Sequence, residues 1–125
     1  MENSINDLQI LVIDDDVMIT TLLSMVLPSN VMVAHSGEEG LKKLEQNQKS
    51  IRLVLLDFQM PGMNGIEVLK IAKEKYPHIP VIMTTSDQHV EALATENGAN
   101  GFVRKPYDAD TILHLVESMA TGTKE

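Results

Sequence analysis

Short apolar runs alternate with longer amphipathic stretches along this chain. The runs cover residues 10–13, 31–34, 53–56, 81–83 and 102–103, and Val, Ile and Leu are their most frequent residues. Nearly continuous apolar character over such short lengths is typical of strands that are buried on both faces of a parallel sheet. The pattern therefore predicts five strands, of which the last is the weakest.

The stretches between the runs have the spacing of amphipathic helices. One face of the first predicted helix carries Ile19, Leu22, Leu23, Val26 and Leu27, and one face of the last carries Ile112, Leu115, Val116 and Met119. Because Met25, Met83 and Met119 fall within apolar patterns, we expect these methionines to fill the core.

Polar residues and one glycine mark the ends of three predicted helices. Ser36 and Glu39 form the pattern of a capping box for a helix that runs to about Asn47. Asp108 is suited to cap the last helix, and Gly98 is suited to end the fourth. These signals support an alternation of five strands with five helices.

This alternation predicts an α/β fold, in which helices cover both faces of a doubly wound, mostly parallel sheet. A sheet of this kind binds its ligand beyond the carboxyl ends of the strands, near the reversal of strand order. The residues that directly follow each apolar run are therefore the candidates for chemistry.

Acidic residues follow two of the runs. Asp14, Asp15 and Asp16 come directly after the first run, and Asp57 comes directly after the third. Crowded carboxylates repel one another unless a cation lies between them, and Mg²⁺ prefers oxygen ligands. Asp14, Asp15 and Asp57 are therefore candidate metal ligands, whereas Asp16 fits the N-cap of the first helix better. A nucleotide-binding loop is not expected here, because it would be rich in glycine rather than in acids.

The fourth and fifth runs are followed by a hydroxyl and by a cation. Thr85 lies beyond the fourth run and Lys105 lies beyond the fifth. A carboxylate beside a divalent cation can attack a phosphoryl group and form an acyl phosphate. An ammonium group and a hydroxyl donor can then neutralise and bind the phosphoryl oxygens. Asp57, Thr85 and Lys105 are consequently the candidate catalytic residues for phosphoryl transfer.

Composition narrows the class of protein further. The chain has 125 residues, no cysteine and a formal charge of −8. This length fits one domain, and the acidic balance argues against a nucleic-acid surface or an anionic-membrane surface. The lack of cysteine excludes a disulfide scaffold and a thiolate zinc site. No apolar run approaches the roughly 20 residues of a membrane span, and no signal-peptide pattern follows Met1, so we expect a cytoplasmic domain.

Four segments lie in a characteristic order along the chain. They are ILVIDDD at 10–16, LLDFQMPGMNG at 55–65, PVIMTTS at 80–86 and GANGFVRKP at 98–106. Together they resemble the receiver domain of two-component response regulators, and the size and layout are similar to those of single-domain chemotaxis-type regulators. The resemblance covers about Leu8 to Met119. It implies a single receiver domain over residues 1–125 with a flavodoxin-like (βα)5 fold and the strand order 2-1-3-4-5.

The resemblance also implies roles for the acidic residues. Asp57 would be the phosphoacceptor. Asp15, Asp57 and the backbone carbonyl of Gln59 would bind Mg²⁺ directly, and Asp14 would act mainly through water.

Further roles follow from the same resemblance. Thr85 and Lys105 would contact the phosphoryl group, and the Lys105–Pro106 peptide bond would be cis. On phosphorylation Thr85 would move inward and Phe102 would follow, as a packing switch without a phenolic hydroxyl. The alternative for Phe102 is that it is simply a core residue.

Two positions are associated in this family with the lifetime of the acyl phosphate. Gln59 and Asp87 occupy them here. An acid at Asp87 can repel or orient the attacking water, so the direction of its effect stays open. Asp87 fits equally well as a cap of the fourth helix, together with Ser86.

The expected function is a two-component signalling switch. A histidine kinase or a histidine phosphotransfer protein would donate the phosphoryl group to Asp57, and a protein partner would bind the face formed by the last two helices and the last strand. Direct binding to nucleic acid is not expected, and enzymatic activity would be limited to self-phosphorylation and slow hydrolysis. The start at Met1 and the short tail after Ala120 favour a stand-alone receiver over a piece of a larger regulator or hybrid kinase.

Two other functions compete with this hypothesis. A Mg²⁺-dependent aspartyl phosphohydrolase also combines an aspartate, a hydroxyl and a lysine, but its nucleophile typically lies in a D-x-D-x-[TV] motif. Residues 14–18 read DDDVM, which has both acids and misses the fifth position. An inert receiver-like scaffold is disfavoured because all the expected site residues are present.

Overall fold

The computed structural model of the chain describes residues 9–27 and 30–120. Leu8, the expected start of the domain core, and residues 121–125 lie outside this part. The strands are β1 (Gln9–Ile13), β2 (Asn30–Ala34), β3 (Ile51–Asp57), β4 (Val81–Thr85) and β5 (Gly101–Arg104). The helices are α1 (Val17–Val26), α2 (Gly37–Asn47), α3 (Gly65–Lys75), α4 (Val90–Glu96) and α5 (Ala109–Ala120).

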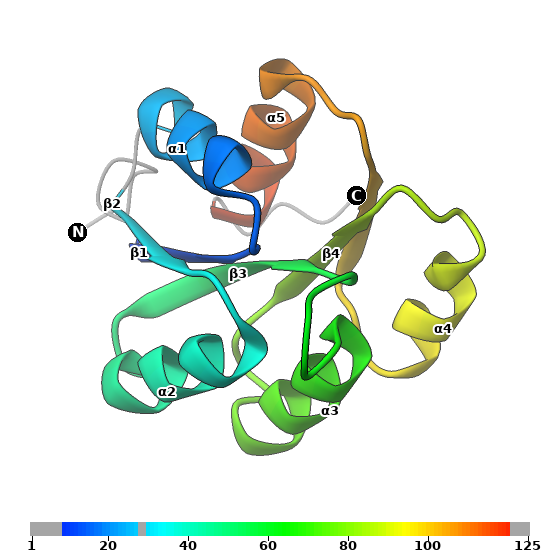
Figure 1. Cartoon of the computed structure of the whole chain (residues 1–125). Coiled ribbons are helices and arrows are strands. Elements are labelled where there is room, and N and C mark those ends of the chain that lie inside the picture. The colour runs from blue at the N-terminus through cyan, green and yellow to red at the C-terminus, as the bar shows by residue number, and fades with distance from the viewer. Residues whose placement is uncertain (1–8, 28–29, 121–125) are drawn as a thin grey trace.

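The five strands form one sheet in the order β2-β1-β3-β4-β5, and every neighbouring pair is parallel. The predicted doubly wound fold and its strand order are therefore confirmed. Figure 1 shows α1 and α5 on one face of the sheet and α2, α3 and α4 on the other. The carboxyl ends of β1 and β3 lie next to each other, because Ile13 pairs with Leu56.

Successive residues of the central strands supply two separate cores, because side chains of a strand alternate between the two faces of the sheet. Ile10 and Val12 of β1 pack with α1 and α5, and the same core contains Leu23 and Ile112. The other core lies under α2, α3 and α4 and is built from the alternate positions, among them Leu11, Ile13, Leu44, Leu69 and Val90. Burial on both faces explains why the strands read as continuous apolar runs.

The helix caps agree with the sequence pattern in most places. Asp16 is the N-cap of α1 and accepts hydrogen bonds from the backbone N of Met18 and Ile19. Oδ1 of Asp108 accepts from the backbone N of Thr111 at 2.8 Å. Gly98 follows the end of α4 with a φ of +98°, in the left-handed region that favours glycine.

The capping box predicted for α2 is only half formed. Ser36 caps the helix and accepts from the backbone N of Glu39 at 3.1 Å. The Glu39 carboxylate accepts from the backbone N of His35 at 2.8 Å, so it reaches one residue further back than the pattern predicts. A complete capping box lies instead at α3, between Asn64 and Glu67.

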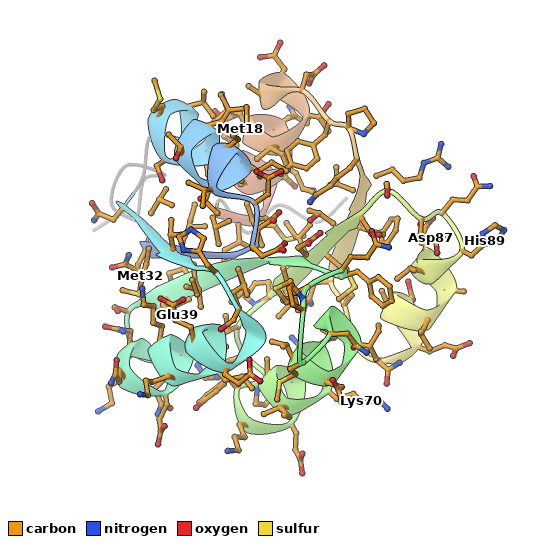
Figure 2. All side chains as sticks on the ribbon, in the orientation of Figure 1. Met18, Met32, Glu39, Lys70, Asp87 and His89 are labelled. Atoms are coloured by element: carbon orange, nitrogen blue, oxygen red, sulfur yellow. The ribbon has the colours of Figure 1, made fainter. Side chains whose placement is uncertain are left out.

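Two expectations for α1 are wrong. Leu22 was expected on the buried face, but it is 49% exposed, and Met25 was expected in the core, but it is 76% exposed. Leu23 and Leu27 bury the helix against the sheet, while Met18, Leu22 and Met25 lie on its outer side (Figure 2 labels Met18). The apolar residues of α1 extend around more of the helix than one core-facing stripe needs, so periodicity alone could not tell which side is buried.

Within the described residues, no helix is both long enough and apolar enough to span a bilayer.

Candidate functional site

The acidic turn after β1 is held in place by a hydrogen bond to β2 and by a hydrogen bond within the turn. Asp14 is buried, and its backbone N donates to the carbonyl O of Ala34 in β2 at 3.0 Å. Its Oδ1 accepts from the backbone N of Asp16 at 2.9 Å. Asp15 lies between these two residues and is exposed. The turn therefore gives its three acids different roles: one buried, one open to solvent and one capping α1.

Asp57 ends β3 and is only 4% exposed. It pairs with Thr84 of β4, and the backbone N of Phe58 donates to the carbonyl O of Thr84 at 2.9 Å. Gly65 then returns the chain against β3, with its backbone N 2.8 Å from the carbonyl O of Phe58. A Cβ at position 65 would lie 2.6 Å from the carbonyl O of Asp57, so only glycine permits this close approach.

Lys105 joins the two buried carboxylates. Its Nζ lies 2.9 Å from Oδ1 of Asp57 and 3.0 Å from Oδ2 of Asp14. The backbone N of Lys105 donates to the carbonyl O of Thr85 at 2.8 Å, and this bond fixes the end of β5 beside β4. The peptide bond between Lys105 and Pro106 is cis.

The protonation of Asp57 and Lys105 reflects this arrangement. Burial raises the pKa of Asp57 to about 6, since the hydrogen bond from Lys105 only partly offsets burial and the charge of Asp14 adds to the shift. Burial opposes the charge on Lys105, but the hydrogen bonds to Asp57 and Asp14 outweigh burial and raise the pKa of the ammonium group. Lys105 therefore stays charged while it neutralises part of the acidic site.

Asp14, Asp15 and Asp57 form a set that can hold a cation. Each offers one carboxylate oxygen, and these oxygens all lie within 4.8 Å of one another. Three carboxylates carry more negative charge than one lysine neutralises, and oxygen donors with an exposed member suit Mg²⁺, which keeps part of its water shell. Gln59, the expected donor of a backbone carbonyl, follows in the loop after β3 with its side chain exposed.

Thr85 lies at the end of β4, one residue beyond the sheet partner of Asp57. Its side chain is buried, and its Oγ1 accepts from the backbone N of Asp87 at 3.1 Å. Phe102 of β5 pairs with Met83 and is partly buried against the core that contains Val90 of α4. Thr85 and Phe102 therefore lie on neighbouring strands.

Asp87 is not the N-cap of α4. The helix begins at Val90 with His89 as its N-cap, and no side chain accepts a hydrogen bond there. Asp87 lies earlier in the loop, where Oδ1 accepts from the backbone N of His89 at 2.9 Å and lies 3.2 Å from its Nδ1 (Figure 2). The alternative of capping by Asp87 and Ser86 is therefore wrong, and Asp87 forms a local turn within the β4–α4 loop.

One contact near the site had no signal in the sequence. Nη1 of Arg104 donates to Oε1 of Gln88 at 2.6 Å and connects the end of β5 to the β4–α4 loop. Exposed arginine and glutamine side chains carry no periodicity or spacing that would predict their pairing. Only the parallel pairing of β4 and β5 brings them together.

The fold and the site together define the class of the protein. It is a doubly wound, flavodoxin-like α/β domain with three carboxylates and one lysine at the carboxyl edge of its sheet. Residues 10–117 match the family model described as the response regulator receiver domain. The chain belongs to this family, as the resemblance predicted.

Comparison with individual proteins agrees with this assignment. The chain is 35% identical over 119 residues to the DNA-binding transcriptional regulator NtrC of Proteus hauseri, covering 91% of this chain and 25% of that protein. It is 34% identical over 124 residues to the autoinducer sensor kinase/phosphatase CqsS of Vibrio cholerae, covering 93% of this chain and 18% of that protein. The chain thus spans a quarter or less of these two relatives.

Solved structures show the same likeness. A receiver domain protein from Clostridium thermocellum superimposes with a TM-score of 0.85 and 31% identity, covering 90% of this chain and 94% of that one. The chemotaxis protein CheY4 of Vibrio cholerae gives a TM-score of 0.83 and 25% identity, covering 90% and 98%. Receiver domains are signalling modules that take phosphate from histidine kinases.

Proposed function

We propose that Asp57 is the phosphoacceptor of a two-component signalling switch, with a histidine kinase or a histidine phosphotransfer protein as donor. The observation that carries the proposal is the placement of Asp57. It is a nearly buried carboxylate that contacts Lys105 and lies within reach of two further carboxylates. Membership in the receiver family and similarity to a sensor kinase support a phosphohistidine donor.

Asp14, Asp15 and Asp57 would hold Mg²⁺, together with the backbone carbonyl of Gln59. The donor set fits this ion because it consists of oxygens and its negative charge exceeds the charge of Lys105. When bound, the ion supplies positive charge that neutralises phosphoryl oxygens.

In the transfer step, an oxygen of the Asp57 carboxylate attacks phosphorus and a P–O bond forms. The P–N bond to the donor histidine breaks, and its electron pair stays on the imidazole nitrogen. Lys105, whose ammonium group contacts Asp57, would bind the phosphoryl oxygens, and Thr85 would donate from its hydroxyl. Hydrolysis of the acyl phosphate later returns the carboxylate and inorganic phosphate. Under this proposal, enzymatic activity is limited to this cycle.

The signal would leave through Thr85, Phe102 and the α4-β5-α5 face, where a protein partner binds. Phe102 is partly buried beside α4, so its movement into space vacated by Thr85 would change that face. Gln59 and Asp87 would set the lifetime of the acyl phosphate, since both lie in the loops that border the site. We also propose that the chain acts as one receiver domain located in the cytoplasm, without direct contact to nucleic acid or membrane.

Labelling by acetyl phosphate with Mg²⁺ tests this function. Wild type should gain one phosphoryl group at Asp57, whereas Asp57→Asn should gain none while its circular dichroism stays unchanged. Asp15→Ala should lose Mg²⁺ affinity and labelling together. Undiminished labelling of Asp57→Asn refutes the assignment. Steady-state turnover of phosphate monoesters would favour an aspartyl phosphohydrolase instead.

A further inference from the structure

The β4–α4 loop is closed into a ring with the end of β5. Oγ1 of Thr85 accepts from the backbone N of Asp87 at 3.1 Å, and the carbonyl O of Thr85 accepts from the backbone N of Lys105 at 2.8 Å. Further along the loop, Nη1 of Arg104 donates to Oε1 of Gln88 at 2.6 Å. These three hydrogen bonds connect Thr85, the loop and the residues at the end of β5.

The loop determines how Thr85 offers its hydroxyl. A hydroxyl group has one proton to donate and can accept as well. Because Oγ1 of Thr85 accepts from the backbone N of Asp87, the proton stays available for another acceptor. A displacement of the loop would break the hydrogen bond from the Asp87 N–H to Thr85, and the threonine side chain could then rotate. The hydrogen bond from the loop therefore restrains the buried hydroxyl.

Arg104 and Lys105 are consecutive residues that contact different parts of the molecule. The Lys105 side chain contacts Asp57 at the acidic site, whereas the Arg104 side chain contacts Gln88 in the loop. Lys105 must change its contacts if a phosphoryl group is attached to Asp57. Such a change acts on the end of β5, where Arg104 contacts Gln88 of the loop.

The hydrogen bond between Gln88 and Arg104 can be broken at a low cost in free energy. Both residues are exposed, so water can replace either partner and the bond contributes only modestly. Phe102 lies two residues before Arg104 and therefore on the same side of β5. It packs against the core that also contains Val90 of α4, directly after the loop.

We propose that Gln88 and Arg104 form a latch that holds Thr85 in the conformation of the unphosphorylated protein. Both are positioning residues, since they act on the site through the loop and Thr85. The inference rests on the proposed function of Asp57. A ligand that prefers the displaced loop binds more tightly when the displaced state is more populated. A phosphoryl mimic is such a ligand under this proposal, so breaking the latch strengthens its binding.

Hydrogen exchange in the unphosphorylated protein tests the latch without any phosphoryl chemistry. Gln88→Ala should accelerate exchange of the Asp87 amide about two- to fivefold, because that amide donates within the ring. Gln46→Ala, the same change at an exposed glutamine of α2, is the matched control and should leave this rate unchanged. Equal Asp87 exchange rates in wild type and Gln88→Ala overturn the proposal.

Titration with beryllofluoride and Mg²⁺ then tests the effect on the site. The chain has only two phenylalanines, so ¹⁹F NMR of fluorophenylalanine-labelled protein reports Phe102 directly, with the second signal from Phe58. Gln88→Ala should bind the mimic about two- to fivefold more tightly. Gln88→Glu should bind it more weakly, because a carboxylate pairs with Arg104. If Gln88→Ala binds the mimic no more tightly than wild type does, the latch is overturned.

An added carboxylate also repels the anionic mimic, so Gln88→Glu is repeated in an Arg104→Ala background. The latch requires that the loss of affinity is larger when Arg104 is present. An equal loss in both backgrounds means that repulsion alone acts, and it refutes the latch. If wild type does not bind the mimic, the proposed function of Asp57 fails, while the exchange rate of the Asp87 amide still decides whether the latch exists.

Discussion

The Nζ of Lys105 lies 2.9 Å from Oδ1 of Asp57, although Asp57 ends β3 and Lys105 follows β5, and these two strands are not neighbours in the sheet. β4 lies between β3 and β5, so the lysine side chain reaches across the end of the intervening strand. The same ammonium group contacts Asp14, which directly follows β1. One cation thus connects the ends of three strands, and it contacts two of the three carboxylates that can hold a metal ion.

Replacement of Lys105 should separate metal binding from phosphoryl transfer. In Lys105→Met, Asp14 and Asp57 lose their shared cation, and we expect Mg²⁺ to bind about tenfold more tightly, because uncompensated carboxylates favour a cation. Labelling by acetyl phosphate should fall at least about tenfold, since a positive group on the phosphoryl oxygens is lost. Calorimetric titration with MgCl₂ and mass spectrometry measure the two effects. Weaker Mg²⁺ binding in the variant would contradict this role of Lys105.

The raised pKa of Asp57 predicts how stability depends on pH without metal. In the folded state Asp57 has a pKa of about 6, whereas the ordinary pKa of an aspartate carboxyl group is 3.8. Between these values the folded state binds more protons than the unfolded state, so the free energy of unfolding falls as pH rises. Asp57→Asn lacks this loss and should be about 1–3 kcal/mol more stable than wild type at pH 7.

Urea unfolding in EDTA from pH 3.5 to 7.5 measures this difference. The stability advantage of Asp57→Asn should fade as pH approaches 3.8. A difference that stays constant across the range would show that the Asp57 carboxylate is not destabilised by burial. Addition of Mg²⁺ to wild type at pH 7 should recover part of the lost stability, because the ion binds only the folded site.

Asp16 should affect the stability of α1 without affecting the metal site. Its carboxylate accepts from two backbone N–H groups at the start of the helix. Asp16→Ala should therefore lower the free energy of unfolding by about 1 kcal/mol. Mg²⁺ affinity should stay within twofold of wild type, roughly the effect of a screened nearby charge. A large loss of affinity would make Asp16 a ligand, the alternative that the sequence left open.

Gly65 should prove essential to the position of Asp57. A methyl group there would lie 2.6 Å from the carbonyl O of Asp57 and 2.6 Å from Cα of Phe58, both in the backbone. We expect Gly65→Ala to lose about 1–3 kcal/mol of stability through overpacking. Mg²⁺ affinity should also fall, because the end of β3 must shift.

Gly62→Ala is the matched control for this prediction. Gly62 has a φ of +79°, so alanine is strained there, but the nearest atom to its Cβ is in the Glu38 side chain at 3.7 Å. The control should lose about 1–2 kcal/mol of stability and keep its Mg²⁺ affinity. Equal losses of affinity in both variants would show that general loop strain, rather than the contact with Asp57, is responsible.

The sequence by itself determined the fold class and the acidic residues of the site. Strands buried on both faces and helices with one apolar stripe leave local patterns, and a parallel sheet collects the residues that follow its strands at one edge. Asp14 and Asp57 were found in this way, because each directly follows a run that forms a strand. The family motifs added the strand order, which the structure confirms.

Only the tertiary structure decided which side chains meet. Nothing local shows that Lys105 contacts both Asp14 and Asp57, that Glu39 reaches His35 rather than Ser36, or that Arg104 pairs with Gln88. The exposure of Met25 was also out of reach, since α1 is apolar beyond its buried face. Periodicity reflects how one element meets water and core, whereas contacts between elements depend on strand register and helix placement, which the whole chain sets at once.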